Sequence, residues 1–194
     1  SETYGDPLVH PQPESYRGNV DPLGLRACYD EGKRYAEMLT MVFVREYGLD
    51  ARIARIFNSY GSFMAAHDGR MVPAFIQAAL RDQPLPIHGD GSQTRSLCYV
   101  DDLIDGLLAL GEAFENQLPD PPVINLGNPD ERTVREIAEA CWRATTNTAP
   151  KLNFVVGHPD DPQRRCPDIT LAREHLYWAP KVDLVEGLQR TANW

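Results

Sequence analysis

Apolar residues occur in short blocks along the chain, and the spacing within each block predicts a helix or a buried strand. The longest block predicts a helix over residues 26–47, with Gly48 placed to end it. Thr133-Val134-Arg135-Glu136 has the form of a capping box, which predicts a helix start. Further helices are expected at 71–80, from a cap at Asp101 or Asp102 to about 114, at 133–145, at 169–176 and after a cap at Asp183.

Short apolar runs between these helices predict strands at 52–57, 85–88, 95–99, 123–126 and 152–156. Residues 5–25 are rich in proline, glycine and polar residues, which is typical of a long surface loop. The alternation of strands and helices predicts an α/β architecture.

A glycine fingerprint for binding a dinucleotide is missing. Such a unit opens with a strand, then G-x-G-x-x-G, then a helix. Gly89-Asp90-Gly91 lacks the third glycine and precedes a predicted strand, so we interpret it as a turn. The chain also begins at Ser1 rather than Met, inside a predicted loop, which indicates a fragment.

Composition narrows the classes of function. The 194 residues carry a net charge of -9, which argues against nucleic acid as an electrostatic partner. No apolar run is long enough to cross a membrane and no signal peptide is recognisable. The four cysteines are widely spaced, and the histidines form no pair at helical spacing, so neither a disulfide framework nor a metal site is expected. Free thiols suit the cytoplasm.

Tyr29 and Lys33 carry the clearest candidate chemistry. They are four residues apart in the predicted helix, so both side chains lie on one face. An ammonium held near a phenol favours the phenolate, which can take a proton from an alcohol. Lysine is rare in this chain, so a Tyr-x-x-x-Lys motif would rarely arise by chance. The alternative interpretation is a tyrosine and a lysine on the helix surface that take part in no reaction.

Further motifs follow in a fixed order and together resemble a known family. They are Ser1–Gly5, Arg26–Arg34, Arg55–Gly61, Asp68–Arg70, Gly89–Arg95, Tyr99–Asp102, Asn125–Asn128 and Asp160–Arg165 with Pro167–Ile169. This order resembles the extended short-chain dehydrogenase/reductases that act on nucleotide sugars, and within them the UDP-glucuronate decarboxylases (UDP-xylose synthases). The resemblance covers essentially the whole chain and corresponds to the C-terminal part of the family.

The resemblance implies a fold and an activity. Residues 1–60 would be the remainder of an NAD-binding, Rossmann-like domain, and 61–194 a small α/β region for the sugar nucleotide; the N-terminal half with the glycine fingerprint would be absent. The family oxidises the sugar C4 hydroxyl with NAD, releases carbon dioxide from the resulting β-keto acid, and returns the hydride to give UDP-xylose. It commonly forms homodimers through the helix that would span 29–47.

The resemblance also implies roles for reacting groups. Tyr29 would be the base and then the acid at the C4 oxygen, and Lys33 would hold a nicotinamide-ribose hydroxyl, so both contact NAD. Ser1 would hydrogen-bond the C4 oxygen, and Glu2 would act beside the ring as an acid/base or orienting group. Arg165 would bind the uronate carboxylate or assist protonation after carbon dioxide leaves.

Four residues would bind the substrate: Asn58, Arg70, Arg95 and Tyr99. Asn58 would contact phosphate or sugar, and the two arginines the UDP moiety, because the guanidinium fork suits diphosphate oxygens. The alternatives are an Asx turn for Asn58, surface ion pairs for the arginines and a core position for Tyr99. The chain departs from the usual family residues at positions 17, 62, 97 and 166, where Arg, Ser, Leu and Cys replace Trp, Pro, Phe and Lys.

Two other functions stay open. A nucleotide-sugar 4,6-dehydratase or 4-epimerase belongs to the same class, but dehydratases typically carry Asp-Glu where this chain has Ser1-Glu2. A non-catalytic remnant that binds a nucleotide sugar or a partner subunit is favoured by the missing fingerprint and opposed by the retained reactive residues. A strand with a glycine fingerprint encoded upstream of Ser1 would favour an enzyme.

Overall fold

The computed structural model describes the whole chain except residues 66, 68 and 158–161. Its helices are α1 (Ala27–Tyr47), α2 (Met71–Leu80), α3 (Val100–Glu112), α4 (Val134–Thr145), α5 (Thr170–Leu176) and α6 (Leu184–Asn193), with 3₁₀ turns η1 (Glu2–Tyr4) and η2 (Glu115–Gln117). Its strands are β1 (Ile53–Ile56), β2 (Ser59–Tyr60), β3 (Leu85–His88), β4 (Thr94–Ser96), β5 (Cys98–Tyr99), β6 (Val123–Leu126), β7 (Glu131–Thr133) and β8 (Leu152–Val155). The predicted α/β architecture is confirmed.

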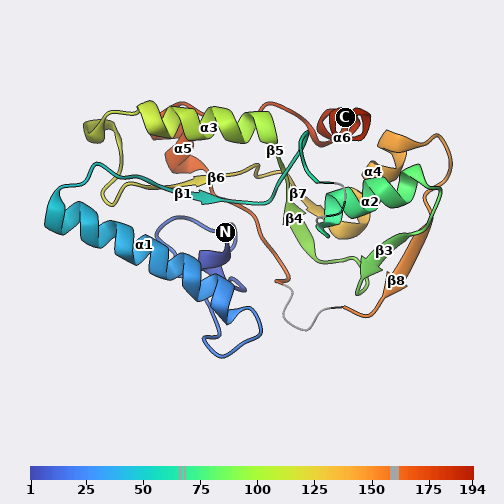
Figure 1. Cartoon of the computed structure of the whole chain (residues 1–194), viewed down its shortest axis with the longest axis horizontal. Helices are drawn as coiled ribbons and strands as arrows, with labels where there is room; N and C mark the ends of the chain where they lie inside the picture. The colour runs from blue at the N-terminus through green and yellow to red at the C-terminus, as the bar shows by residue number, and fades with distance from the viewer. Residues whose placement is uncertain (66, 68, 158–161) are drawn as a thin grey trace.

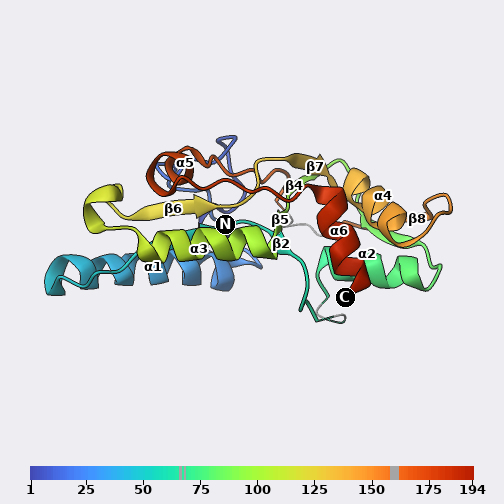
Figure 2. The same cartoon turned by 90° about the horizontal axis from the view of Figure 1, so that it is seen from above.

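Within the described residues, the strands pair in four short ladders. β1 pairs in parallel with β6, in a register that places Ile53 opposite Val123. The pairs β2–β5 and β3–β8 are also parallel, whereas β4–β7 is antiparallel. Helices α1 and α3 lie on opposite sides of the β1–β6 pair (Figures 1 and 2). The parallel pairing joins segments far apart in sequence, and η1 packs separately against α1.

Two apolar clusters support these elements. One surrounds β6, α3 and α5 and contains Leu103, Ile124, Leu126 and Trp178. The other lies between α2, β3, α4 and α6 and contains fully buried Trp142, Ile137 and Leu188. Figure 1 shows the two regions side by side along the long axis of the molecule. No helix among the described residues combines the length and apolar character that a membrane span requires.

Several sequence predictions hold at the level of single hydrogen bonds. Thr133 and Glu136 form the predicted capping box, with Glu136 N donating to Thr133 Oγ1 and Thr133 N donating to Glu136 Oε2. Asp183 caps α6 in the same way, since its side chain accepts a hydrogen bond from the backbone N–H of Glu186. Gly48 ends α1 with φ of 63°, the left-handed conformation that glycine adopts without steric cost.

Other predictions were wrong in detail. Neither Asp101 nor Asp102 caps α3, which begins at Val100 with Tyr99 at its N-cap. Asp102 is buried instead, and its Oδ2 accepts hydrogen bonds from the backbone of Lys181 and Val182. The strand predicted at 95–99 is divided into β4 and β5, because the two halves pair with different strands. The loop at 5–25 is anchored to the core through Gln12, which is fully buried.

The close approach of α6 to β2 yields a stability prediction. A Cβ added at Gly187 would lie 2.1 Å from the Tyr60 hydroxyl oxygen, and Tyr60 is buried. Gly187→Ala is therefore expected to lower the free energy of unfolding by about 1–3 kcal/mol. Gly111→Ala in α3 is the matched control, since nothing lies within 4 Å of its added Cβ. Urea denaturation should show the control unchanged or stabilised by about 0.5–1 kcal/mol; equal effects at both positions would contradict the packing argument.

Candidate active site

A cleft of about 880 Å³ runs between α1 and β1, and most predicted reactive residues line it. Tyr29 and Lys33 project into it from one face of α1, as their four-residue spacing predicts. Lys33 Nζ lies 5.7 Å from the centre of the Tyr29 ring, and Tyr29 is half exposed. Ser1 and Glu2 reach the same cleft from the turn at η1. The structure thus gathers a phenol, an ammonium, a hydroxyl and a carboxylate around one space.

Arg165 joins this group from the far end of the sequence. It is 4% exposed, and its Nη1 donates to Glu2 Oε1 at 2.5 Å and to Ser1 Oγ at 3.2 Å. Burial alone would raise the pKa of Glu2, but the Arg165 guanidinium and the chain's own ammonium lower it to about 2. Glu2 is consequently a carboxylate throughout the physiological pH range.

Two residues at the site, Arg26 and Asp30, escaped the sequence prediction. Arg26 Nη2 lies 3.4 Å from Glu2 Oε1, and its guanidinium carbon lies 6.0 Å from the centre of the Tyr29 ring. Asp30 follows Tyr29 directly and is 6% exposed, and burial raises its pKa. Both belong to the stretch Arg26–Arg34 that carries the family resemblance, which was the available signal.

Buried polar atoms without a hydrogen-bond partner concentrate here. Among the described residues, such side-chain atoms include Arg26 Nε, Asp30 Oδ1, Asn58 Oδ1 and Arg165 Nε. An unsatisfied buried polar group is costly, and Arg26 and Asn58 line a cleft, so ligand atoms there would complete their hydrogen bonding.

A second cleft, of about 420 Å³, continues from the first. Asn58, Ser59 and Arg70 line both, and Arg26, His88 and Arg95 line the second. Arg95 is oriented by hydrogen bonds from its Nη1 to the carbonyls of Thr94, at 2.7 Å, and Pro162, at 2.8 Å. Several guanidinium groups around one cleft suit an anion such as a diphosphate.

Tyr99 is not brought to either cleft. It is 3% exposed, its ring packs edge-on against Tyr60, and its hydroxyl lies 3.3 Å from Ser62 Oγ. The core position, which was the alternative interpretation, describes it. Asp68, Asp160 and Asp161 of the resembling motifs lie outside the described residues.

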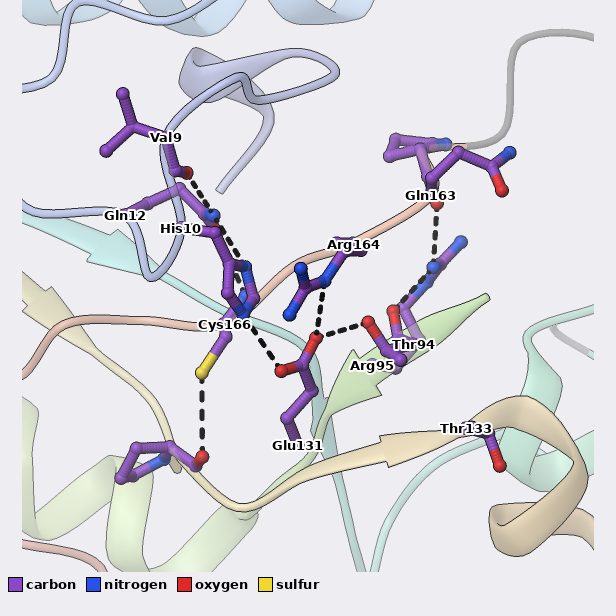
Figure 3. A network of polar contacts seen from close by, with 12 residues as sticks. Val9, His10, Gln12, Thr94, Arg95, Glu131, Thr133, Gln163, Arg164 and Cys166 are labelled. Carbon is purple, nitrogen blue, oxygen red and sulfur yellow. Dashed lines mark hydrogen bonds and ion pairs between the residues drawn. The ribbon is translucent and has the colours of Figure 1, made fainter. Parts of the chain in front are cut away.

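A polar network centred on Glu131 places the segment that carries Arg165 (Figure 3). Glu131 Oε2 pairs with His10 Nε2 at 2.9 Å, while Oε1 accepts from Thr94 Oγ1 and lies 3.5 Å from Arg164 Nε. The Gln12 side chain accepts from the backbone N–H of Cys166 at 2.9 Å. Arg165 is therefore held between two anchored neighbours.

His10, Glu131 and Cys166 bring nitrogen, oxygen and sulfur atoms within 4.8 Å of one another. Their hydrogen bonds argue against a metal ion. The Gln12 amide nitrogen, oriented by Val9 O, lies 3.4 Å from His10 Nδ1, so Nδ1 accepts and Nε2 carries the proton shared with Glu131. The Cys166 thiol donates to the carbonyl oxygen of Pro129 at 3.5 Å.

The residues present fit one end of NAD. Tyr29 and Lys33 face a cleft wide enough for a nicotinamide ribose, and the Lys33 ammonium can donate to its hydroxyls. No strand, glycine-rich turn and helix in succession, the usual cradle for the pyrophosphate, occurs among the described residues.

Comparison with known proteins decides the family. Residues 1–127 match the model of the NAD dependent epimerase/dehydratase family. The chain belongs to this family. It is 53% identical over 188 residues to UDP-glucuronic acid decarboxylase 5 of Arabidopsis thaliana, covering 97% of this chain and 53% of that protein. It is 46% identical over all 194 residues to UDP-glucuronic acid decarboxylase 1 of Danio rerio, covering 45% of it.

Solved structures of the family agree with the fold. The UDP-glucose 4-epimerase of Thermotoga maritima superposes with a TM-score of 0.85 at 30% identity, over 98% of this chain and 59% of that one. A UDP-glucuronic acid 4-epimerase from Bacillus cereus, in complex with UDP-glucuronic acid and NAD, gives 0.83 at 28% identity, over 100% and 58%. The chain spans about half the length of the curated family members it matches.

The incomplete cofactor site gives a second prediction. The isolated 194-residue chain is expected to bind NAD with a dissociation constant weaker than about 1 mM, because the pyrophosphate has no cradle among the described residues. Isothermal titration calorimetry measures this directly. UDP is the positive control, since the cleft lined by Arg70 and Arg95 lies within the chain. Micromolar NAD binding would contradict the prediction.

Proposed function

We propose that the natural protein, with whatever sequence precedes Ser1, converts UDP-glucuronate to UDP-xylose and carbon dioxide. The observation that carries the proposal is that Tyr29, Lys33, Ser1 and Glu2 line one cleft, while Arg165 donates to both Ser1 and Glu2. The 46–53% identity to UDP-glucuronic acid decarboxylases of plants and fish supports the choice of substrate.

Tyr29 is the proton-transfer group of the proposed reaction. Tyr29 takes the proton of the C4 hydroxyl, and the Lys33 ammonium lies beside its ring on the same helical face. Bound NAD would supply the hydride acceptor and later return the hydride to C4. Tyr29 gives the proton back to the C4 oxygen in that last step.

In the proposed reaction, Ser1, Glu2 and Arg165 contact the C4 oxygen, the sugar ring and the uronate carboxylate. The Ser1 hydroxyl hydrogen-bonds the C4 oxygen, and oxidation at C4 makes a β-keto acid. When the C5–C6 bond breaks, its electron pair passes toward the C4 ketone and C6 leaves as carbon dioxide. Arg165 binds the uronate carboxylate or assists protonation at C5, while Glu2 orients Arg165 and the sugar.

The second cleft would bind the nucleotide. Asn58 and Arg70 stand where the two clefts meet, which suits the phosphate nearest the sugar. Arg95 lies further along and would contact the outer part of UDP. Tyr99 lies in the same apolar cluster as Phe75 and Leu97, which line this cleft.

A 4-epimerase is the second candidate, because the solved structures from Thermotoga maritima and Bacillus cereus described above are 4-epimerases. Incubation of the natural protein with UDP-glucuronate and NAD separates the candidates. Release of carbon dioxide with UDP-xylose supports the decarboxylase. UDP-galacturonate without carbon dioxide would establish the epimerase, and recovery of unchanged substrate would favour a non-catalytic binding protein.

The assembly and location belong to the same proposal. An exposed apolar strip on α1, formed by Tyr35, Met38, Leu39, Val42 and Phe43, supports a homodimer through this helix. The four free cysteines support a cytoplasmic location. The division of the chain at residue 60 into a cofactor part and a substrate part is also proposed, with β6 completing the first part through its pairing with β1.

A further inference from the structure

Arg55 makes an unusually extensive set of contacts for a strand residue. Its Nε and Nη2 donate to the two carboxylate oxygens of Glu37, each at 2.8 Å. Its Nη1 donates to the Tyr4 hydroxyl at 3.0 Å and to the carbonyl of Glu14 at 2.8 Å. The guanidinium carbon also lies 4.9 Å from the centre of the Tyr4 ring. One side chain thus joins three separate segments.

Each partner lies a short distance from a proposed site residue. Glu37 follows Lys33 by one turn of α1, on the same face. Tyr4 lies two residues after Glu2, in η1. Arg55 itself stands on β1, three residues before Asn58. The guanidinium therefore connects α1, which carries Tyr29, with η1, which carries Glu2, and with the strand that leads to Asn58.

The connection is rigid for physical reasons. A bidentate guanidinium–carboxylate pair fixes both distance and orientation, and both side chains are largely buried. The hydrogen bonds with Glu37 and Tyr4 raise the pKa of Arg55 despite the opposing effect of burial, so it stays charged. The Tyr4 hydroxyl in turn donates to Oδ1 of Asn125, on β6, at 2.7 Å, so the network extends to that strand.

We propose that Arg55 is a positioning residue that sets the spacing between Ser1–Glu2 and Tyr29–Lys33 for the reaction proposed above, on which this inference rests. Arg55 and Glu37 also line the cleft, but the role proposed here acts through the groups that Arg55 holds in place. A misplacement of about 1 Å in a catalytic group can cost about 100-fold in rate.

Arg55→Lys in the natural protein is the first test. Lysine keeps the charge but cannot bond Glu37 through two parallel N–H groups. The kcat for UDP-glucuronate is expected to fall about 100-fold while KM and the affinity for UDP change less than about 3-fold. The nucleotide cleft is expected to be unaffected because Arg70 and Arg95 lie on other segments. Arg34, which donates to Thr3 O and Arg17 O, still joins α1 to η1, so the variant should fold.

Arg52→Lys is the matched control. Arg52 precedes Arg55 on the same segment and is similarly buried, but its guanidinium donates to the carbonyls of Gly111 and Ala113 at the end of α3. Its kcat should stay within about 2-fold of wild type. Glu37→Gln should lower kcat about as much as Arg55→Lys does. The kcat of the double variant should be no lower than that of the poorer single variant, because both changes remove the same contact.

Hydrogen exchange of the ligand-free protein provides a readout independent of catalysis. Arg55→Lys should speed exchange in η1 and the first half of α1, and Arg52→Lys should not. A fall in kcat that only mirrors a smaller fraction of UDP-binding protein, or unchanged exchange in both segments, would overturn the positioning role. If wild type leaves UDP-glucuronate unchanged, the proposed function fails, and the exchange data still decide whether Arg55 joins the two segments.

Discussion

Replacing Tyr29 with Phe should lower kcat for UDP-glucuronate by about 10²- to 10⁴-fold, the usual contribution of a general acid/base. Phenylalanine keeps the ring between Arg26 and Lys33 and removes only the hydroxyl. Tyr29 is half exposed, so the variant should keep its stability. Steady-state release of carbon dioxide from the natural protein measures the loss.

Tyr35→Phe is the control for this change. Tyr35 stands on the same helix, is exposed, and belongs to the apolar strip rather than to the cleft. Its kcat should equal that of wild type. A Tyr29→Phe variant with more than a tenth of wild-type kcat would show that another group transfers the proton.

Replacing Arg165 with Met should destabilise the 194-residue chain by about 3–5 kcal/mol, the cost of removing one partner from a buried ion pair. The negative charge of Glu2 would then be balanced only in part, by Arg26 Nη2 at 3.4 Å. Urea denaturation at neutral pH measures the change. Arg143→Met is the control, because its pair with Glu139 is exposed and should contribute less than about 1 kcal/mol.

The same ion pair predicts a pH dependence. The pKa of Glu2 is lowered from 4.5 to about 2 in the folded chain, despite the opposing effect of burial, mainly by Arg165. Its contribution is therefore complete above pH 4.5 and is lost as the pH falls toward 2, a change of about 3 kcal/mol. In the Arg165→Met variant, the loss of stability between pH 4.5 and pH 2 should be smaller, or stability should rise over this range. An equal acid sensitivity in wild type and variant would show that the pair is not formed in solution.

Local rules explain which elements the sequence predicted. The capping residues of α4 and α6 and the glycine that ends α1 act within a few residues, so their effects are visible in the sequence. The division between β4 and β5 depends on two distant partners, β7 and β2. Asp102 looked like a cap because it opens a helix, but its hydrogen bonds go to residues about 80 positions away.

The candidate site shows the same distinction. The motif Tyr29-x-x-x-Lys33 needs only helical geometry, and the structure places both side chains in the cleft. The pairing of Glu2 with Arg165 spans 163 residues, and only family resemblance associated the two. Arg26 and Arg55 both lie in motifs that carry the family resemblance, but those motifs did not indicate which of their residues contact the site groups.

The segment after residue 161 lines neither cleft but contacts residues of both. The backbone carbonyl of Gln163 accepts from Thr94 N, next to Arg95 of the nucleotide cleft, and Arg165 two residues later contacts Glu2. One short segment therefore helps to hold both Arg95 and Arg165 in place. Under the proposed reaction, free glucuronate would then be turned over slowly even at saturating concentration, because binding energy from the remote nucleotide supports the reacting geometry.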